Sequence, residues 1–369
     1  MSRGTSPGTG RGTGRGRPLR VLIVGQAPGA PGGIASVQRL HEAALRRRDD
    51  VAVTVVVTFD ESGPLRRLRL LLSGLLRATA LVLAGRVDVV DLHVSKGLSV
   101  LRKGLLVAVA RARGVPTVLH AHAGAFAEWF DALPRPARAL VAAVLRPDRM
   151  VVLSEEAREV YRTRLHLPPE RLVVAANPVE WPDAVPDRDP GGPVEAVFLG
   201  RLVDRKGVFD LLEGLALVPA DARKRLHATL AGHGDADAVR HRVVELGLSD
   251  LVEVRTWLGP AERDALLGRA QLLVLPSWWE ALPMAVLEAM AWAVTPVVTP
   301  VGGLVGLVRD GENGVRVPLQ DPAALAGTLE KLLLDDASRQ RLGAAARTDV
   351  RGYGADAWAD RLVALYRGL

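Results

Sequence analysis

The chain has 369 residues, of which 49% are hydrophobic and 24% charged, the balance of a globular protein long enough for two domains. It contains no cysteine, which excludes disulfides, thiolate metal sites and cysteine nucleophiles and is typical of a reducing cytoplasm. Part of its formal net charge of +7 comes from arginines at the N-terminal end: Arg3, Arg11, Arg15, Arg17 and Arg20.

Residues 1–18 form a Gly/Arg-rich segment with too few apolar side chains to offset the entropy of ordering, so we expect a disordered tail. A nucleic-acid-binding arm is disfavoured because no base-stacking aromatics accompany the arginines. This segment is not followed by the apolar core of a signal peptide. The longest uncharged run, residues 289–308, is interrupted by prolines and glycines, which argues against a membrane span. We therefore expect a cytoplasmic protein.

From residue 20 onward, short Val/Ile/Leu runs alternate with longer periodic stretches, the pattern of buried parallel strands joined by helices. Strands are predicted at 20–25, 51–58, 87–92, 115–120, 149–153, 194–199, 226–231, 251–255, 271–275 and 296–299. In the first half, helices are predicted near 34–48, 64–84, 97–113, 135–146 and 154–165. The fold class is therefore α/β, with two doubly wound, Rossmann-like lobes that face each other across a cleft.

Five prolines between residues 177 and 193 indicate an interdomain linker. The predicted lobes then span 19–176 and 194–350. Residues 351–369 form a C-terminal segment, with a helix from about 355 to 368, that we expect to pack back on the first lobe.

The most informative segment is PSWWEALPMAVLEAMA, residues 276–291. A strand ends before it, and a helix is expected to open near Leu282 or Pro283, because proline is favoured at the first helical position. Free amides at such a helix start can hold a phosphate. Glu280 precedes the helix and Glu288 lies inside it, about 9 Å further along at 1.5 Å per residue. The two carboxylates are therefore spaced to meet two different parts of one ligand.

This segment resembles the donor-binding motif of the retaining family 4 glycosyltransferases, whose two glutamates are likewise separated by seven residues. The resemblance covers residues 20 to about 320 and implies the GT-B architecture. The second lobe would then bind the nucleotide sugar and the first the acceptor. The resemblance implies that Glu280 contacts the transferred sugar, that Glu288 bonds the ribose hydroxyls, and that Leu282, Pro283 and Met284 lie against the donor.

GRLVDRKG, residues 200–207, carries two cations, Arg201 and Lys206, between a strand end and a helix start. A departing nucleoside diphosphate needs fixed positive charge where its own charge develops. The family has an arginine and a lysine at this spacing for that purpose. A lone pair of this kind is usually surface decoration, but lysine is rare in this chain, which favours a specific role for Lys206.

Two glycine-containing turns are candidates for contact with the donor. Gly32 and Gly33 precede a predicted helix, where glycines let backbone amides approach a phosphate. Gly232, in a GxG turn after a strand, matches a turn that the family often has near the nucleotide. Each turn taken alone is more typical of tight chain reversal, and the family resemblance favours the binding role.

Histidines follow two strands of the first lobe. His122, in HAHAG, matches the family's histidine near the reacting sugar, whereas His120 is expected to be structural. His93, Ser95 and Glu128 are candidates to face the acceptor, at even odds against a purely structural role.

The chain departs from the family pattern at Ala293 and Thr295, where the family has glycine and proline, and at Gly306, where it has a glutamate. The first two are expected to be tolerated, and the third bears on donor preference and activity. Two Asp-x-Asp triplets, at 187–189 and 235–237, are placed in the linker and at a helix start, so no metal and no other cofactor is expected.

The sequence predicts a metal-independent hexosyltransferase, and the family resemblance implies that it retains the anomeric configuration. The donor is a UDP- or GDP-sugar and the acceptor is a hydroxyl of a growing polysaccharide or glycolipid, such as a lipid-linked glycan. Rival interpretations are a GT-B sugar-nucleotide epimerase, a silent subunit of a glycan-assembly complex and, least favoured, a glycosidase using Glu280 and Glu288.

Within residues 64–84, the residues Leu68, Leu71, Leu72, Leu75, Leu76, Val82 and Leu83 are expected on one helical face and Arg66, Arg69 and Arg77 opposite. The pattern is consistent with peripheral contact with anionic lipid at the inner face of the cell membrane. An ordinary helix packed on the sheet is the favoured alternative.

Overall fold

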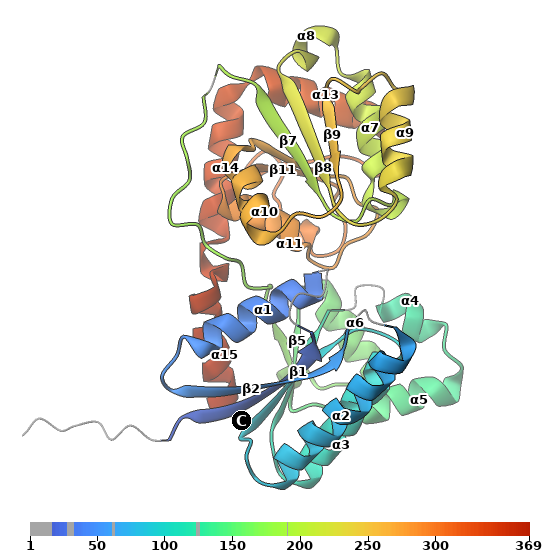
Figure 1. Ribbon diagram of the computed structural model, residues 1–369, viewed down its shortest axis with the longest axis vertical. Coiled ribbons are helices and arrows are strands. Elements are labelled where there is room, and N and C mark those ends of the chain that lie inside the picture. The colour runs from blue at the N-terminus through green and yellow to red at the C-terminus, as the bar shows by residue number, and fades with distance from the viewer. Residues whose placement is uncertain (1–16, 28–32, 61–62, 123–125, 190) are drawn as a thin grey trace, which may run out of the picture.

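The computed structural model describes residues 17–27, 33–60, 63–122, 126–189 and 191–369, which form two α/β lobes, one above the other (Figure 1). The predicted N-terminal tail lies almost wholly outside the described residues. At its end, Arg17 donates a hydrogen bond of 2.8 Å to Asp88.

The first lobe is a six-stranded parallel sheet in the order β2-β1-β3-β4-β5-β6. Its helices cover both faces: α1 packs on one face, and α2, α3 and α5 on the other. The elements are β1 Leu19–Gln26, α1 Gly33–Arg46, β2 Val51–Phe59, α2 Pro64–Leu83, β3 Val89–Val94, α3 Leu98–Ala112, β4 Thr117–Ala121, α4 Phe126–Asp131, α5 Arg135–Val144, β5 Arg149–Val152, α6 Glu155–Leu165, the short 3-10 turn η1 Pro169–Arg171 and β6 Leu172–Val174.

The second lobe is another six-stranded parallel sheet, in the order β12-β11-β10-β7-β8-β9. One continuous apolar core surrounds it. The elements are β7 Val194–Leu199, the 3-10 turn η2 Asp204–Lys206, α7 Val208–Leu217, α8 Ala220–Arg223, β8 Leu226–Ala231, α9 Ala236–Glu245, β9 Val252–Arg255, α10 Pro260–Arg269, β10 Leu272–Leu275, α11 Met284–Ala291, β11 Thr295–Val298, α12 Leu304–Leu307, β12 Val315–Arg316, α13 Pro322–Leu334, α14 Asp336–Asp349 and the 3-10 turn η3 Arg351–Tyr353. The last helix, α15 Ala355–Arg367, belongs to the first lobe.

The strand order fixes where ligands are expected. It reverses direction between β1 and β3 in the first sheet and between β7 and β10 in the second. In open parallel sheets, ligands bind beyond the carboxyl ends of the strands at such a reversal. Gly33, Ser95, Arg201 and Glu280 all lie in or beside the loops that follow these four strands.

Most predicted elements are present within a few residues of their expected bounds, but the strands β6 and β12 and the helices α4, α8, α13 and α14 were not predicted. Two helices begin one or two residues later than expected. The helix after Glu280 begins at Met284, so Pro283 precedes it as the N-cap residue. Lys206 ends the turn η2 and does not open a helix, because Gly207 adopts φ 71° before α7 begins.

Two stretches of chain cross side by side between the lobes. The proline-rich segment after β6 runs upward, and Val179 there bonds Tyr353 and Ala355 of the returning chain, with N–O distances of 2.8 and 3.1 Å. Helix α15 then packs on the first sheet beside α1 (Figure 1). Its buried residues, Trp358, Ala359, Leu362, Val363 and Tyr366, share one core with β1, β3, β4 and β5.

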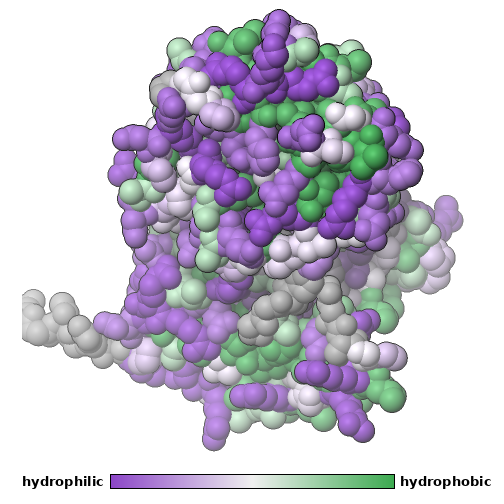
Figure 2. Space-filling view, turned by 45° about the horizontal axis from the view of Figure 1, so that its top comes forward, coloured by the Kyte–Doolittle hydropathy of each residue, from purple (hydrophilic) through white to green (hydrophobic). Residues whose placement is uncertain are grey.

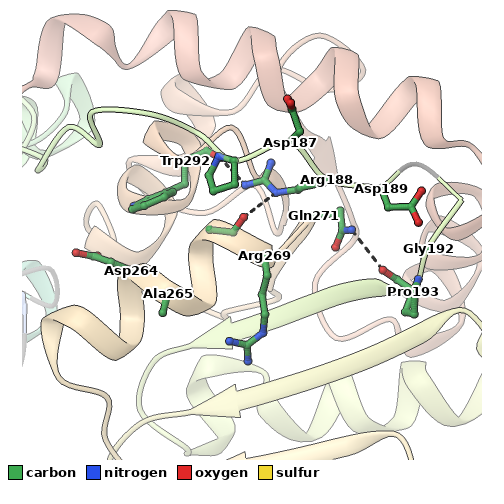
Figure 3. A pocket seen from close by; sticks show the side chains of 12 residues that line it. Asp187, Arg188, Asp189, Gly192, Pro193, Asp264, Ala265, Arg269, Gln271 and Trp292 are labelled. Carbon is green, nitrogen blue, oxygen red and sulfur yellow. Dashed lines mark hydrogen bonds between the residues drawn. The ribbon is translucent and has the colours of Figure 1, made fainter.

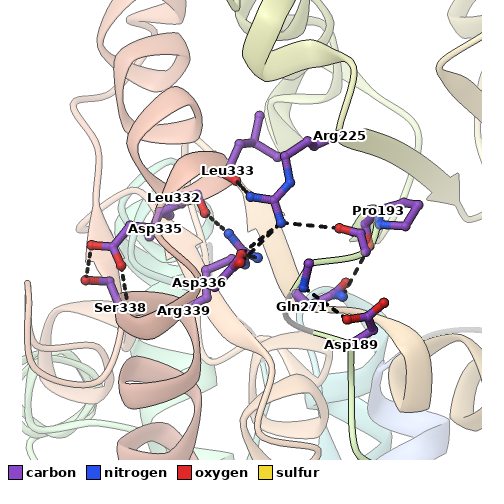
Figure 4. Close-up of polar contacts among 12 residues, drawn as sticks. Asp189, Pro193, Arg225, Gln271, Leu332, Leu333, Asp335, Asp336, Ser338 and Arg339 are labelled. Carbon is purple, nitrogen blue, oxygen red and sulfur yellow. Dashed lines mark hydrogen bonds and ion pairs between the residues drawn. The ribbon is translucent and has the colours of Figure 1, made fainter.

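Arginines anchor the helices α13 and α14 to the amino end of the second sheet (Figure 4). The guanidinium of Arg225, next to β8, donates to the carbonyl of Leu333 at 3.0 Å and to Asp336 at 3.0 Å. Arg339 also donates to Asp336 and to the carbonyl of Leu332. These bonds lie at the amino ends of the strands, away from the predicted site, so we assign them to stability.

Ala293 stands where the family has glycine, and it adopts φ 55°, the left-handed region. That conformation costs a residue with a Cβ roughly 1–2 kcal/mol. We expect Ala293→Gly to raise the free energy of unfolding by about 0.5–1 kcal/mol. This is the net gain once the larger entropy of glycine in the unfolded chain has been subtracted. Denaturant unfolding measures it, and Ala344→Gly in the exposed face of α14 is the control, expected to destabilise by about 1 kcal/mol. A loss of stability in both variants would contradict the assignment of strain to Ala293.

Candidate functional site

The candidate site of the second lobe is centred on an ion pair. Lys206 Nζ lies 2.5 Å from Glu280 Oε1, and the hydroxyl of Ser277 donates to the same oxygen at 2.8 Å. Glu280 is 5% exposed, and Lys206 retains more exposure, 20% for its side chain. The carboxylate is therefore fixed by two donors, while the ammonium group can still reach a ligand.

Glycines allow the loops that carry this pair to touch. A Cβ at Gly207 would lie 2.1 Å from the carbonyl oxygen of Pro276, and one at Gly302 would lie 1.8 Å from that of Glu280. Trp278 adds a hydrogen bond of 2.7 Å from its indole to Asp210 on α7. The loops after β7, β10 and β11 thus form one packed unit that holds Glu280 in place.

Arg201, the second predicted cation, is exposed, and its side chain makes no hydrogen bond or ion pair with any described residue. The neighbouring turn is tight, because a Cβ at Gly232 would lie 1.7 Å from the carbonyl oxygen of Gly200. Gly232 therefore lets the loop after β8 approach the loop that carries Arg201. The guanidinium of Arg201 is available for an anionic ligand.

Glu288, in the middle of α11, is 8% exposed and accepts a hydrogen bond of 2.7 Å from Arg263 of α10. Burial raises the pKa of Glu288 to about 7, although the charge of Arg263 acts in the opposite direction. Arg263 also bonds Asp264 at 2.7 Å. Sequence reasoning missed Arg263 and Ser277, because a partner from another helix and a serine in a loop carry no pattern of their own.

The first lobe meets this site through α1, which lies on the side of the lower lobe that faces the upper one (Figure 1). A side chain at Gly33 would come within 4.0 Å of Met284 Cγ, and Val37 and Leu40 are part of the second lobe's core. Asn177 donates to the carbonyl of Leu282 at 3.3 Å. Gly32, the other predicted glycine, lies outside the described residues.

Histidines form a buried cluster behind the carboxyl ends of β3 and β4. His122 is partly exposed, and its Nε2 lies 2.9 Å from Nδ1 of His93. His93, which we expected to face the acceptor, has a fully buried side chain that also contacts His41 at 3.1 Å. It is buried because it lies within β3, all six residues of which are buried. His120 has the structural role expected of it, 2.9 Å from Asp91.

The other two acceptor candidates lie near the surface. Ser95 follows β3, and its backbone amide bonds the hydroxyl of Ser99 at 3.3 Å. Glu128 is exposed in the first turn of α4. Neither makes a contact with a described residue that gives it a role in the site.

An open pocket of about 560 Å³ lies elsewhere, between the linker and α10 (Figure 3). Arg188 from the linker crosses it and donates to the carbonyls of Leu267 at 3.1 Å and Trp292 at 2.7 Å, and also to Gly268 and Ala293. One guanidinium therefore caps the C-terminal ends of both α10 and α11. In the other triplet, Asp235 caps α9 by accepting from the Ala238 amide at 3.3 Å. Arg188 and Asp235 thus have structural roles.

Comparisons with known proteins agree with this geometry. The family model described as Glycosyl transferases group 1 matches residues 184–349, and the model described as Glycosyltransferase Family 4 matches residues 18–180. A D-inositol 3-phosphate glycosyltransferase of Corynebacterium efficiens is 32% identical over 188 residues, 48% of this chain and 44% of the relative. A glycogen synthase of Mycobacterium tuberculosis is 32% identical over 264 residues, 65% of this chain and 60% of the relative. The chain thus spans about half the length of these curated relatives.

Two solved structures have the same fold. HepE of Anabaena in complex with UDP-glucose aligns with a TM-score of 0.73 at 16% identity, covering 95% of this chain and 100% of the other. Sucrose-phosphate synthase from Thermosynechococcus elongatus aligns with a TM-score of 0.74 at 22% identity, covering 95% of this chain and 98% of the other. The two-lobed architecture is therefore that of the GT-B proteins.

Proposed function

Since the chain belongs to the family 4 glycosyltransferases and has the GT-B fold, we propose that it transfers a sugar from a nucleotide-activated donor to a hydroxyl acceptor. The proposal extends to retention of the anomeric configuration, a UDP- or GDP-hexose donor and independence from metal ions. The acceptor is proposed to be a polysaccharide or glycolipid under construction. The activity would make the protein a cytoplasmic enzyme that works beside the membrane.

One observation carries this proposal. Lys206 and Glu280 pair at 2.5 Å at the point where the second sheet reverses its strand order. The exposed Arg201, which has no side-chain partner among the described residues, follows a strand at the same point. A sugar nucleotide needs both kinds of group, cations for its diphosphate and a fixed carboxylate for its sugar hydroxyls. A glycosidase would have no use for the two cations.

The similar proteins give more support to the proposed class of donor than to any particular acceptor. HepE structures hold UDP, UDP and glucose, or UDP-glucose, which is consistent with a uridine nucleotide here. The named relatives act on acceptors as different as D-inositol 3-phosphate and glycogen. The acceptor of this chain is therefore left to experiment.

In the proposed reaction, the acceptor hydroxyl attacks the anomeric carbon on the face from which the diphosphate departs. The bond from this carbon to the leaving oxygen breaks, the new glycosidic bond forms, and the leaving diphosphate oxygen takes the acceptor proton. Arg201 and Lys206 stabilise the negative charge that develops on the diphosphate. Glu280, fixed by Lys206 and Ser277, orients the sugar through its hydroxyls.

The test combines calorimetry with UDP- and GDP-sugars and mass analysis of products formed with cell lipids. Transfer adds one hexose to the acceptor and releases a nucleoside diphosphate, whereas an epimerase would return a rearranged sugar nucleotide without acceptor. Donor binding without any product would favour a silent subunit, consistent with Gly306 in place of the family glutamate. Absence of binding to every nucleotide sugar would overturn the proposal.

His122 is expected to act on the sugar and not on the diphosphate. A hydrogen bond between neutral groups contributes about 0.5–1.5 kcal/mol, so His122→Ala should lower turnover roughly two- to tenfold. Affinity for the nucleoside diphosphate should stay unchanged, as measured by calorimetry beside initial rates. A variant with normal turnover would remove His122 from the site.

The membrane proposal rests on an apolar face made by three neighbouring helices of the first lobe, α2, α3 and α5. We define the leucine face by its exposed members: Leu65, Leu68, Leu72, Leu76, Leu98, Leu101, Leu105 and Leu140. Figure 2 shows hydrophobic and hydrophilic surface intermixed over the lower lobe. None of the three helices contains an acidic residue, and α2 carries four arginines, so the face suits an anionic bilayer.

An ordinary helix packed on the sheet would bury its leucines there, but not all the leucines of α2 face the sheet. A Cβ at Gly74 would lie 2.4 Å from the carbonyl oxygen of Val57, so small residues bring the helix close to β2. Gly74, Ala78 and Val82 are buried, whereas Leu72 is 53% and Leu76 is 72% exposed. In the described part of the chain, no helix has the length and apolarity needed to cross a bilayer.

Changing Arg66, Arg69 and Arg77 together to glutamine is expected to lower co-sedimentation with anionic vesicles severalfold, because each arginine is attracted to the lipid charge. Neutral vesicles should show little difference. The control changes three arginines of the second lobe, Arg240, Arg269 and Arg341, to glutamine. If the first variant sediments like the parent, α2 is not the docking surface.

A further inference from the structure

Six polar side chains form a continuous buried chain of hydrogen bonds from the partly exposed His122 to the C-terminal helix. They come from α1, β3, β4, the loop after β4, and α15: His41, Asp91, His93, His120, His122 and Tyr366. We call this set the histidine relay. All members except His122 are at most 4% exposed.

The direction in which the hydrogen bonds of the histidine relay are donated follows from its inner end, at Asp91 and Tyr366. Asp91 accepts a hydrogen bond of 2.5 Å from the hydroxyl of Tyr366. Burial, and then the neighbouring Asp91, raises the pKa of Tyr366 well above its usual value, so this hydroxyl keeps its proton. Its oxygen can then only accept from His41, whose Nε2 lies 3.2 Å away.

The same logic passes through two neutral imidazoles. Burial lowers the pKa of His41 to about 3 and that of His93 well below its usual value, so each ring carries one proton. With the proton of His41 on Nε2, its Nδ1 accepts from Nε2 of His93 at 3.1 Å. The unpaired Oδ1 of Asp91, 3.5 Å from the same Nε2, also favours a proton there. His93 Nδ1 is then an acceptor.

These hydrogen bonds determine which ring nitrogen of His122, the outer end of the histidine relay, carries the proton. His122 Nε2 lies 2.9 Å from His93 Nδ1 and must donate to it. Burial lowers the pKa of His122 to about 3, so the ring is neutral and its Nδ1 carries a lone pair. No described residue donates to that nitrogen, which leaves it available to a ligand hydroxyl.

We propose that Tyr366 is a positioning residue that, through His41 and His93, holds His122 as its Nε2-protonated tautomer, with Nδ1 left to accept a hydrogen bond from a donor-sugar hydroxyl. The hydrogen bond to the donor sugar rests on the proposed function, whereas the tautomer of His122 does not. It also gives α15 a role in the site: the last helix crosses back to the first lobe and supplies the group that orients the relay.

The histidine relay explains the positions of three side chains that could otherwise be taken for the ligands of a metal ion. The ligand atoms of His41, Asp91 and His120 lie within 4.8 Å of one another. The Tyr366 hydroxyl already bridges His41 and Asp91, and His120 bonds the same carboxylate oxygen as Tyr366. Each of these atoms thus has a hydrogen-bond partner without a metal ion.

The decisive variant is Tyr366→Phe, which keeps the ring and removes only the hydroxyl. His41 Nε2 then has no hydrogen-bond acceptor among the described residues, since Asp91 Oδ2 lies 3.9 Å away, so the proton of His41 is no longer confined to Nε2. The reversed relay, with protons on Nδ1 of all three histidines, becomes accessible. The matched control is Tyr161→Phe, because the buried hydroxyl of Tyr161 has no hydrogen-bond partner among the described residues.

The first measurement is nitrogen NMR of the full chain with ¹⁵N-labelled histidine and no ligand, in which protonated and unprotonated ring nitrogens are distinguished. The His122 signals are identified by their loss in His122→Ala. We expect Nε2 protonation in the parent and in Tyr161→Phe, and a mixture of tautomers in Tyr366→Phe. Nδ1 protonation in the parent, or an unchanged His122 in Tyr366→Phe, would overturn the relay.

The second measurement is turnover with the nucleotide sugar that binds. We expect Tyr366→Phe to lower turnover by no more than His122→Ala does, with diphosphate affinity unchanged, and the double variant to equal His122→Ala alone. Additive losses would contradict action through His122. If no sugar is transferred at all, the proposed function fails while the NMR result stands. If added Zn²⁺ shifts the His41 and His120 signals and a chelator reverses it, a metal site replaces the relay.

Discussion

Changing Lys206 to alanine is expected to lower turnover about a hundred- to thousandfold, the usual loss when a donor to a developing negative charge is removed. The ammonium group lies 2.5 Å from Glu280 and retains enough exposure to reach the diphosphate of a bound donor. Its loss should therefore weaken a nucleoside diphosphate more than a monophosphate. Initial rates and calorimetry with both nucleotides measure the two effects.

The control for Lys206 has two parts. Lys224→Ala removes an exposed lysine at the end of α8 whose one ion-pair partner among the described residues is Asp221, and it should change neither rate nor affinity. Because Lys206→Ala leaves Glu280 buried without its cation, the double variant with Glu280→Gln removes the unpaired charge. If the single variant binds UDP and GDP as the parent does, the donor site has been misplaced.

Glu288→Gln is expected to weaken nucleotide binding roughly ten- to a hundredfold, the equivalent of the 1.5–3 kcal/mol that a charge-assisted hydrogen bond contributes. The carboxylate should accept from the ribose hydroxyls, so mono- and diphosphates should lose affinity alike. This equal loss distinguishes Glu288 from Lys206. Calorimetry with both nucleotides measures it, and Glu245→Gln, an exposed glutamate on α9, is the control.

The pH dependence follows from the pKa of Glu288, which burial raises to about 7. Above that pH the carboxylate is ionised and paired with Arg263, and below it the charge is lost. Nucleotide affinity of the parent should therefore fall as the pH decreases from 8 to 6. Glu288→Gln has no such titrating group. Because the parent and the variant bind the same nucleotide, the difference between their profiles of affinity against pH isolates the contribution of Glu288. Parallel profiles would contradict the assignment.

The order of strands and helices could be predicted from the sequence because buried parallel strands are continuous apolar runs and their crossover helices have a 3.6-residue period. The candidate donor-side residues could be predicted for a related reason. Arg201, Lys206 and Glu280 lie in loops that follow strands, and Glu288 lies in the helix after one of these loops, so the local chain fixes their spacing. Short elements such as β6 and β12 lack enough residues to show a period.

Contacts between distant segments were decided only by the tertiary structure. Arg263 reaches Glu288 from another helix, and Tyr366 reaches Asp91 across 275 positions, so no local pattern announces either pair. His93 and His122 carry similar sequence signals, yet His93 lies within the wholly buried strand β3, whereas His122 follows the end of β4 and is partly exposed. The sequence by itself determined which groups this protein has for the proposed binding of a sugar nucleotide. Folding decided which of them are paired, neutral or exposed, because burial and the charges of distant partners set those states.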